Sequence, residues 1–375
     1  MKIGIDARFY GPFGKGLGRY TERLIHSLER IDTKNEYYIF LRKENFDAYI
    51  PQGSRFKKIL ADFQWYTLEE QREMPRVLNE HALDLVHFPH FNVPLMYRKP
   101  FVVTIHDLII MRFPTKKATT LGPLKYKFKQ WGYKTVIRSA VKRSKKVITV
   151  SNYSRSELAK YFHVPKEKVV VTYEAIDEND IHCRDFASVK EKFSINEPYL
   201  LYVGNVYPHK NIERLVRAFK RARENPELKN IHLTIVCKED YFLSEIKKIV
   251  KNECIDNVNF TGYISDDELA CMYSNSLAYV FPSLYEGFGL PPLEAMGHGI
   301  PVIASNTTCI PEILGDAAAY FDPMSVDDIV GAITKIAVQS ELRESLIEKG
   351  KNRVKEFSWN TCAKQTLAVY KQALE

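Results

Sequence analysis

Short apolar runs rich in β-branched residues recur along the chain, and longer amphipathic stretches separate them. Such runs predict buried strands, and the amphipathic stretches, at Arg19–Arg30, Ile212–Arg223 and Asp327–Val338, predict helices. Because strand and helix alternate, we expect parallel sheets with helices on both faces, in an α/β fold. The twelve predicted strands fall into two series, which are Ile3–Ile5, Tyr37–Leu41, Leu85–Phe88, Phe101–Ile105, Val147–Val150 and Val169–Tyr173, and then Tyr199–Val203, His232–Cys237, Val258–Phe260, Ala278–Phe281, Pro301–Ala304 and Ala318–Phe321.

Two strand series predict two doubly wound domains. We place the break between them near Ile176–Pro198, a polar stretch. The expected domains are residues 1–180 and 190–357. A last predicted helix, near Asn360–Leu374, is separated from the second sheet by another helix. We therefore expect residues 360–375 to dock on the first domain.

Composition narrows the class of protein. The 375 residues are 45% apolar and 27% charged, which excludes a disordered chain, a collagen and a coiled coil. No apolar run is long enough for a membrane span, and Asp6 and Arg8 interrupt the region where a signal peptide would be apolar. The cysteines are sparse and form no C-x-x-C pair, so we interpret all of them as reduced thiols of a cytoplasmic protein: Cys183, Cys237, Cys254, Cys271, Cys309 and Cys362.

The net charge of +8 is unevenly distributed. Residues 1–180 hold 32 Lys and Arg against 20 Asp and Glu, whereas residues 181–375 hold 22 against 26. Between Leu108 and Ser156 there are 13 basic residues and no acidic one. This asymmetry indicates an anionic partner for the first half. The alternative is a basic face that is simply solvated.

The segment from Phe281 to Gly297 carries the clearest chemistry. A predicted strand ends at Phe281, a glycine-containing loop follows, and Pro291 and Pro292 open a helix. Backbone amides at Gly287, Phe288, Gly289 and Leu290 would face an anion such as a phosphate. Glu286 and Glu294 flank this loop, and carboxylates accept hydrogen bonds from sugar hydroxyls. The arrangement suits a sugar nucleotide, although a capped helix start with two surface glutamates gives the same pattern.

This segment resembles the motif of the group 1 retaining glycosyltransferases, which have two Rossmann-like domains facing across a cleft, the GT-B architecture. The resemblance extends to Gly299–Ser305 and Ile310–Asp316 and covers nearly the whole chain. It implies that Glu286 contacts the hydroxyls of the donor sugar and that Glu294 contacts the ribose. It also implies transfer of a sugar from a nucleoside diphosphate to a glycan or lipid-linked acceptor.

A second loop, from Gly204 to Asn211, also follows a strand and precedes a helix. An isolated lysine in such a loop is usually solvated, but the family resemblance implies that Lys210 binds the donor diphosphate. Gly204 and Asn205 would line the same site. Many members of the family carry Arg where this chain has Asn205, and His209 and Arg214 are alternative sources of a second cation.

Three further groups of residues are candidates. His106 follows a strand, and the resemblance places it near the donor sugar for positioning and charge stabilisation. We expect Asp107 either to cap a helix or to support a neighbouring residue of the site. Gly16 and Gly18 lie in a glycine-rich turn that the family uses beside the acceptor and the β-phosphate. For contacts with the nucleotide, the resemblance suggests Lys238, Tyr263 and Ile264. A lone His and a buried Ile are otherwise ordinary core residues.

The implied reaction retains the anomeric configuration, with negative charge growing on the departing diphosphate. The sequence has no D-x-D triplet and no cluster of metal ligands, so we expect a catalyst that needs neither metal nor cofactor. Lys210 and the helix start after Gly289 would stabilise the charge. Alternative functions are a sugar-nucleotide epimerase or phosphorylase on the same architecture, and a basic nucleic-acid-binding protein, although no nucleic-acid-binding module is recognisable. The loop around Lys210 looks most like bacterial mannosyltransferases of polysaccharide assembly, which favours GDP-mannose over a UDP-sugar.

The basic stretch between Arg112 and Lys146 predicts a further contact. Read as a helix from about Leu124 to Val141, it presents Phe128, Trp131 and Thr135 on one side. A basic helix with an aromatic stripe can lie on an anionic membrane surface. We therefore expect peripheral docking on the inner membrane face, unless the stripe packs on the first domain. The lysines that would contact the lipid include Lys125, Lys127 and Lys129.

Overall fold

A computed structural model describes residues 1–113, 123–176 and 183–375, which form two units, each built on one parallel sheet. The first unit contains residues 1–111, the described part of 119–174, and 358–375. The second contains residues 112 and 113, the described part of 175–182, and 183–357. The two parallel α/β sheets confirm the predicted fold class.

The first sheet has seven strands in the order β3-β2-β1-β4-β5-β6-β7. Its strands are β1 (Lys2–Asp6), β2 (Glu36–Leu41), β3 (Phe56–Leu60), β4 (Leu85–Phe88), β5 (Phe101–Thr104), β6 (Lys146–Thr149) and β7 (Val169–Val171). The helices along this part of the chain are η1 (Pro12–Gly14), α1 (Lys15–Ile31), α2 (Lys43–Phe46), α3 (Leu68–Glu80), α4 (Ile109–Arg112), α5 (Pro123–Arg143), α6 (Asn152–Phe162), η3 (Lys166–Lys168) and, at the end of the chain, α15 (Trp359–Gln372).

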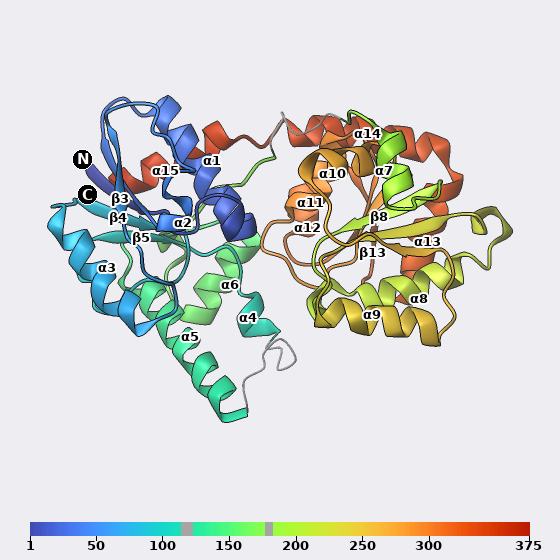
Figure 1. Cartoon of the computed structure of the whole chain (residues 1–375), viewed down its shortest axis with the longest axis horizontal. Helices are drawn as coiled ribbons and strands as arrows, with labels where there is room; N and C mark the ends of the chain where they lie inside the picture. Colours follow the sequence, from blue (N-terminus) through green and yellow to red (C-terminus); the bar gives the residue numbers. More distant parts are fainter. Residues whose placement is uncertain (114–122, 177–182) are drawn as a thin grey trace. The chain divides into compact units, whose positions relative to one another are not determined.

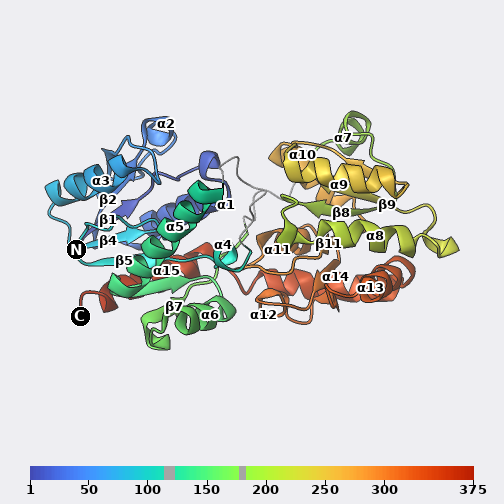
Figure 2. The same cartoon turned by 90° about the horizontal axis from the view of Figure 1, so that it is seen from below.

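The second sheet has six strands in the order β10-β9-β8-β11-β12-β13. Its strands are β8 (Tyr199–Val203), β9 (His232–Val236), β10 (Val258–Phe260), β11 (Ala278–Phe281), β12 (Val302–Ser305) and β13 (Ala318–Phe321). The helices are α7 (Phe186–Lys192), η5 (Pro208–Lys210), α8 (Ile212–Ala222), η6 (Pro226–Leu228), α9 (Tyr241–Asn252), α10 (Asp266–Ser274), α11 (Leu290–Gly297), α12 (Ile310–Leu314), α13 (Val326–Val338) and α14 (Ser340–Val354). Helices α8 and α13 lie side by side over this sheet (Figure 2).

All twelve predicted strands are present, with ends that differ by two residues at most. The pattern missed one strand, β3, whose sequence is Phe-Lys-Lys-Ile-Leu. Because β3 is an edge strand, paired only with β2, it needs no continuous apolar run. Only Phe56 of this strand is buried, and Lys57 is exposed, so the apolar signal was too weak to identify it.

The strand order reverses once in each sheet. In the first sheet β1 is hydrogen-bonded to both β2 and β4, and in the second β8 is hydrogen-bonded to both β9 and β11. In the first sheet the chain continues from β1 and from β4 in opposite directions across the sheet, and in the second it does so from β8 and from β11. The loops at the carboxyl ends of each such pair of strands therefore diverge. In open parallel sheets such a switch point is where ligands bind. The loops of interest are therefore those after β1, β4, β8 and β11.

The C-terminal helix α15 is part of the first unit, where it lies beside α1 (Figure 1). A buried hydrogen-bond chain helps to hold it there. The Tyr370 hydroxyl lies 2.7 Å from Nδ1 of His87 on β4, and His87 Nε2 lies 2.8 Å from the Thr104 hydroxyl on β5. Burial lowers the pKa of His87 to about 3, so its ring is neutral and can accept one of these hydrogen bonds.

No helix among the described residues is both long enough and apolar enough to cross a membrane.

Two glycines of α1 provide a test of how the loop after β1 packs. A Cβ at Gly18 would lie 2.0 Å from the carbonyl oxygen of Gly11 and 2.5 Å from that of Phe9, whereas a Cβ at Gly16 would meet no atom within 4 Å. We expect Gly18→Ala to lower the free energy of unfolding by about 1–3 kcal/mol, because backbone must shift to admit the methyl group.

The matched variant Gly16→Ala should be neutral or slightly stabilising, since alanine favours a helix. Chemical denaturation of the two variants compares them directly. Equal stability of both variants would contradict the proposed packing of the loop on α1.

Candidate functional site

Lys210 and Glu286, two of the residues singled out in the sequence, form an ion pair at the switch point of the second sheet. Lys210 ends η5, in the loop after β8, and Glu286 lies in the loop after β11. Lys210 Nζ lies 2.6 Å from Glu286 Oε1, and the two side chains are only 16% and 8% exposed. A cation and a carboxylate that are both largely withdrawn from water are stable only when paired, so the two side chains hold each other in place.

The two loops are also tied together through their backbones. Leu284 N donates a hydrogen bond to the carbonyl oxygen of His209 over 2.7 Å. The buried amide of Asn211 donates to the carbonyl oxygens of Pro282, at 3.1 Å, and Pro323, at 2.8 Å. Asn211 therefore joins the loops after β8, β11 and β13, which positions the neighbouring Lys210.

The helix α11 begins directly after Gly289, whose φ of 98° is in the left-handed region that favours glycine. The amide of Leu290, the first residue of the helix, has no partner within the helix and carries partial positive charge. Glu294 is half-buried on the same helix and accepts a hydrogen bond from the Tyr273 hydroxyl over 3.3 Å. The Glu286 carboxylate therefore lies before the start of α11, and the Glu294 carboxylate lies within that helix, in the order that the sequence predicted.

The position that departs from the family pattern, Asn205, has a local structural role. Asn205 Oδ1 accepts a hydrogen bond from Tyr207 N, and its carbonyl oxygen accepts one from the Tyr202 hydroxyl. Burial and the charge of Lys210 lower the pKa of His209 to about 4, so His209 is neutral near pH 7 and supplies no second cation. Arg214 donates a hydrogen bond to the Asn211 side chain.

The residues suggested for the nucleotide lie at the carboxyl ends of β9 and β10. Lys238 Nζ lies 4.6 Å from the centre of the Tyr263 ring, and the Tyr263 side chain is 69% exposed. Ile264 is buried, as a core residue would be, so only its backbone could contact a ligand. Lys238 and Tyr263 thus form a cation–π pair whose tyrosine ring is largely exposed.

His106 belongs to the first unit, where both of its ring nitrogens face acceptors. Nδ1 lies 2.9 Å from Glu174 Oε1, and Nε2 lies 3.0 Å from the carbonyl oxygen of Pro89. A ring that donates from both nitrogens is an imidazolium. Burial opposes this charge, but the hydrogen bond and the charge of Glu174 outweigh it and raise the pKa of His106. Asp107 Oδ1 accepts from Ile109 N, which caps α4 as predicted.

The predicted membrane helix is present as α5, but the side chains of residues 114–129, including Lys125, Lys127 and Lys129, lie outside the described residues. Among the described side chains Trp131 is 68% exposed, and Lys134, Arg138 and Lys142 are exposed. Tyr133 instead packs on Phe91 with a ring-centre distance of 4.4 Å. Part of the aromatic content of α5 therefore faces the protein and part faces water.

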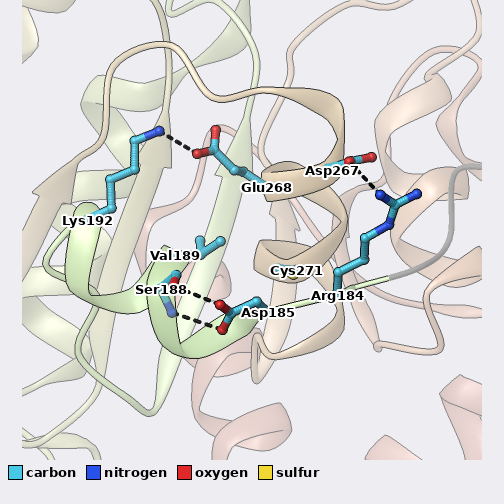
Figure 3. Close-up of a pocket in the computed structure, with 8 residues that line it drawn as sticks. All are labelled: Arg184, Asp185, Ser188, Val189, Lys192, Asp267, Glu268 and Cys271. Atoms are coloured by element: carbon cyan, nitrogen blue, oxygen red, sulfur yellow. Dashed lines mark hydrogen bonds and ion pairs between the residues drawn. The ribbon is translucent and has the colours of Figure 1, made fainter.

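A pocket of about 210 Å³ lies between α7 and α10, and Figure 3 shows the residues that line it. Lys192 pairs with Glu268 and Arg184 with Asp267 across it, whereas Asp185 caps α7 through Ser188. None of the predicted donor-binding residues lines this pocket. Its other charged side chains form ion pairs with one another across the pocket, which indicates a structural role.

A disulfide beside this pocket corrects one prediction from the sequence. Cys183 and Cys271 form a disulfide with their Cα atoms 4.3 Å apart, so the interpretation of all six cysteines as reduced thiols is wrong for these two. The pair is separated by 88 residues, and only the packing of the segment before α7 on α10 brings them together. The other cysteines are free thiols: Cys237, Cys254, Cys309 and Cys362.

Two residues that support the Glu286 loop were not identified from the sequence. The thiol of Cys309 donates to the carbonyl oxygens of Glu286 and Phe288, each over 3.3 Å, and Thr308 Oγ1 accepts from Glu286 N over 3.4 Å. Burial raises the pKa of the Cys309 thiol, which keeps it protonated as a donor. Both residues lie directly before the Ile310–Asp316 motif, and this position beside the motif is the sequence feature that could have identified them.

Comparisons with known proteins agree with this arrangement. Residues 184–353 match the family described as glycosyl transferases group 1, and residues 14–180 match glycosyltransferase family 4. The chain is 28% identical to O-antigen chain mannosyltransferase B of Escherichia coli, over 95% of this chain and 96% of that protein. It is 33% identical to O-antigen chain mannosyltransferase RfbU of Salmonella typhimurium, over 84% of each chain.

Solved structures share the fold at lower identity. Sucrose-phosphate synthase from Thermosynechococcus elongatus superposes with a TM-score of 0.74 at 21% identity, over 99% of this chain and 98% of that chain. Anabaena HepE in complex with UDP-glucose superposes with a TM-score of 0.74 at 16% identity, over 99% of each chain. The two parallel sheets, the matched families and these relatives together identify the chain as a member of the group 1 glycosyltransferases, a family of retaining hexosyltransferases with the GT-B fold.

Proposed function

We propose that the protein transfers mannose from GDP-mannose to a hydroxyl of a glycan or lipid-linked acceptor in polysaccharide assembly, with retention of configuration. The Lys210–Glu286 pair at the switch point of the second sheet carries this proposal, because it combines a diphosphate-binding cation with a carboxylate that can bind sugar hydroxyls. The choice of mannose is supported by the names of the relatives, which are O-antigen chain mannosyltransferases. A UDP-sugar is the alternative donor, since HepE was solved with UDP-glucose.

The chemical role of each group follows from where charge develops. As the glycosidic bond to the diphosphate breaks, the leaving phosphate becomes more negative and the sugar acquires oxocarbenium character. Lys210 and the amides at the start of α11 would stabilise the phosphate. Glu286 would exchange its ion pair with Lys210 for hydrogen bonds to the donor sugar, and Glu294 would bind the ribose.

The proposal assigns no step to a metal ion. Among the described residues no group of three His, Cys, Asp or Glu side chains is arranged to hold one. The positive charge opposite the diphosphate would then come from Lys210 and from the helix start. The leaving phosphate would itself accept the proton of the acceptor hydroxyl, on the face from which it departs.

His106 would act through its charge. A positive imidazolium near the donor sugar would destabilise positive charge on the sugar, but it would stabilise an anionic oxygen of the leaving phosphate. Both ring N–H groups are already engaged, by Glu174 and by Pro89, so the ring orientation is fixed before a ligand binds. Glu174 is therefore the residue on which the charge of His106 depends.

We also propose that the protein docks peripherally on an anionic membrane surface through α5. The support is the run of 13 basic residues without an acidic one between Leu108 and Ser156, together with the exposed Trp131. A lysine near an anionic surface contributes about 1 kcal/mol, so a few such residues hold a protein reversibly. This docking would bring the enzyme to a lipid-linked acceptor.

The first prediction separates the roles of the two glutamates. Glu286→Gln should lower the rate of sugar transfer about 100-fold, an effect of about 2.7 kcal/mol, because the amide cannot match the charge of the carboxylate in the transition state. Glu294→Gln should mainly weaken donor binding. Steady-state kinetics with GDP-mannose and a glycan acceptor measure both effects, and unchanged kinetics in both variants would show that the donor site is wrongly assigned.

The second prediction concerns the diphosphate. Lys210→Ala should weaken binding of GDP-mannose and of GDP by about 10-fold to 100-fold, as expected for one charge-assisted hydrogen bond. Guanosine should bind almost equally to both proteins, because it lacks the phosphates. Isothermal titration in EDTA measures all three ligands. Equal losses for guanosine and GDP would indicate a distorted protein, and a loss of GDP binding to the wild type in EDTA would contradict the metal-free mechanism.

The third prediction concerns pH. Because the pKa of His106 is raised in the folded protein, its pairing with Glu174 stabilises the fold fully below pH 6.5, the ordinary pKa of histidine. This stabilisation is lost as the pH rises through the higher pKa of the folded state. Glu174→Gln should therefore lower the melting temperature more at pH 6 than at pH 9.

The control for this experiment is the same substitution in a His106→Gln background, where the effect of Glu174→Gln should not change with pH. The alkaline limb of the pH–rate profile should also move to lower pH in Glu174→Gln. A pH-independent loss of stability in the single variant would show that the pair is not ionic.

A further inference from the structure

Side chains from the end of β12 and from the turn before α12 form hydrogen bonds along the loop that carries Glu286. The two segments are adjacent because β11 and β12 are paired in the sheet. Ser305 Oγ donates to the carbonyl oxygen of Ser283 over 2.6 Å, and Thr307 Oγ1 donates to the same oxygen over 3.4 Å. Four side chains contact the loop in this way, and we call them the clamp: Ser305, Thr307, Thr308 and Cys309.

The second half of the clamp contacts the backbone of Glu286 itself. Glu286 N donates to Thr308 Oγ1 over 3.4 Å, and the Cys309 thiol donates to the carbonyl oxygens of Glu286 and Phe288 over 3.3 Å each. Cys309 is completely buried, and burial raises the pKa of its thiol, so the thiol stays protonated and remains a donor. Both peptide groups that flank the Glu286 Cα are therefore held.

Thr308 makes its contact from a strained backbone. Its φ of 57° is in the left-handed region, which a β-branched residue rarely adopts. Glycine or asparagine would adopt this conformation at lower cost, but glycine would lack the side-chain oxygen that accepts from Glu286 N. Strain of this kind persists only where the surrounding structure holds it, and it is concentrated at functional sites.

The helix that follows the clamp is anchored at its other end by Arg353 of α14. The guanidinium donates to the carbonyl oxygens of Glu312, at 2.5 Å, and Ile313, at 2.8 Å. It also lies over the Phe357 ring, 5.0 Å from the ring centre. Phe357 in turn packs edge-on against Phe288, with a ring-centre distance of 5.7 Å. The clamp is thus fixed to α14, and the loop is supported from a second side.

The clamp holds Glu286 without using its carboxylate. In the structure that carboxylate is paired with Lys210, 2.6 Å away. In the proposed reaction Lys210 contacts the diphosphate instead, so Glu286 loses the ion pair when its position matters most. The hydrogen bonds of the clamp go to the backbone of the loop and do not involve Lys210. They can therefore persist after the donor has bound.

We propose that the clamp positions Glu286 for sugar transfer, by fixing its backbone so that the carboxylate stays against the donor sugar once Lys210 has engaged the diphosphate. This inference rests on the proposed function, because it names what holds the carboxylate in that reaction. The members of the clamp are positioning residues, since they act through Glu286. Their loss should lower kcat and leave the binding of GDP intact, because GDP lacks the sugar that Glu286 contacts.

The test compares variants that remove the two contacts with Glu286. Cys309→Ala and Thr308→Gly should each lower kcat about 10-fold, because a displaced catalytic group loses rate steeply. In both variants the Kd for GDP should stay within about twofold of the wild-type value. Cys309→Ser and Thr308→Ser keep a hydroxyl at the same positions, so they should restore kcat to within about threefold of the wild type.

Asn259→Ala is the matched control. Asn259, on β10 of the same unit, also donates to two carbonyl oxygens, those of Phe193 at 2.8 Å and Ser194 at 3.3 Å. Its loss should lower the melting temperature as Cys309→Ala does, but leave kcat unchanged. Thr308→Gly should keep the melting temperature within about 2 °C, because relief of the strained φ offsets the lost hydrogen bond. If kcat falls only in proportion to the melting temperature across these variants, the clamp is merely structural and the proposal is overturned.

Two measurements separate this inference from the proposed function. In a Glu286→Gln background, Cys309→Ala should change kcat by less than about twofold, because the carboxylate that the clamp positions is absent. A full 10-fold loss in that background would mean that the clamp acts on another group. Wild-type kinetics in Glu286→Gln alone would overturn the proposed function.

Hydrogen–deuterium exchange tests the clamp without any substrate. Mass spectrometry of peptides that contain Glu286 should show exchange at least about fivefold faster in Thr308→Gly than in Asn259→Ala, since only the former frees the Glu286 amide. Equal exchange in these two variants would overturn the clamp, whatever the outcome of the kinetics.

Discussion

The order of strands in the two parallel sheets is the constraint on which the rest of this structure depends. Hydrogen bonding of β8 to both β9 and β11 places the loops after β8 and β11 next to each other, although about 75 residues of sequence separate Lys210 from Glu286. The pairing of β1 with both β2 and β4 does the same for Phe9 and His90 in the first unit. Function then follows from which side chains these loops present.

Buried or half-buried charges at these sites occur with opposite charges beside them. Lys210 is paired with Glu286, His106 with Glu174, and Arg8 with Asp6 and Glu70. An ion withdrawn from water is tolerated only with such a partner, so the pairs maintain the sites before a substrate binds. The ion pairs differ in whether a ligand would take the place of one partner. In the proposed reaction a phosphate would replace Glu286 as the partner of Lys210, whereas Glu70 accepts a hydrogen bond from Tyr66 N and so helps to hold the loop itself.

Side-chain hydrogen bonds to backbone make the functional loops stiff. Asn211 joins three loops of the second unit, and Cys309 holds the carbonyl oxygens of the Glu286 loop. In the first unit the buried Asn45 amide donates to the carbonyl oxygens of Ala7, Arg8 and Tyr10. Loops tied in this way keep their shape without secondary structure of their own. A donor or acceptor can then bind without first ordering the loop, which avoids an entropic cost.

The sequence by itself determined the fold class, the strands with continuous apolar runs, and the loop and helix start around Glu286 and Glu294. These features are local, since the hydrophobic period, the Gly and Pro residues that end an element and the spacing of motifs are all recognisable within about 20 residues. The family assignment depends on the same local motifs. The edge strand β3 was missed because Lys57 and Lys58 interrupt its apolar pattern.

Only the tertiary structure decided which distant residues meet. The ion pair of Lys210 with Glu286, the charge that Glu174 imposes on His106, the disulfide of Cys183 with Cys271 and the stacking of Trp65 on Phe9 all join separate loops. Each of these contacts depends on strand order and on the packing of helices. Neither strand order nor helix packing can be recognised from residues at a fixed spacing in the sequence. For the same reason the neutral state of His209 could not be foreseen, because burial sets it and burial is a property of the folded chain.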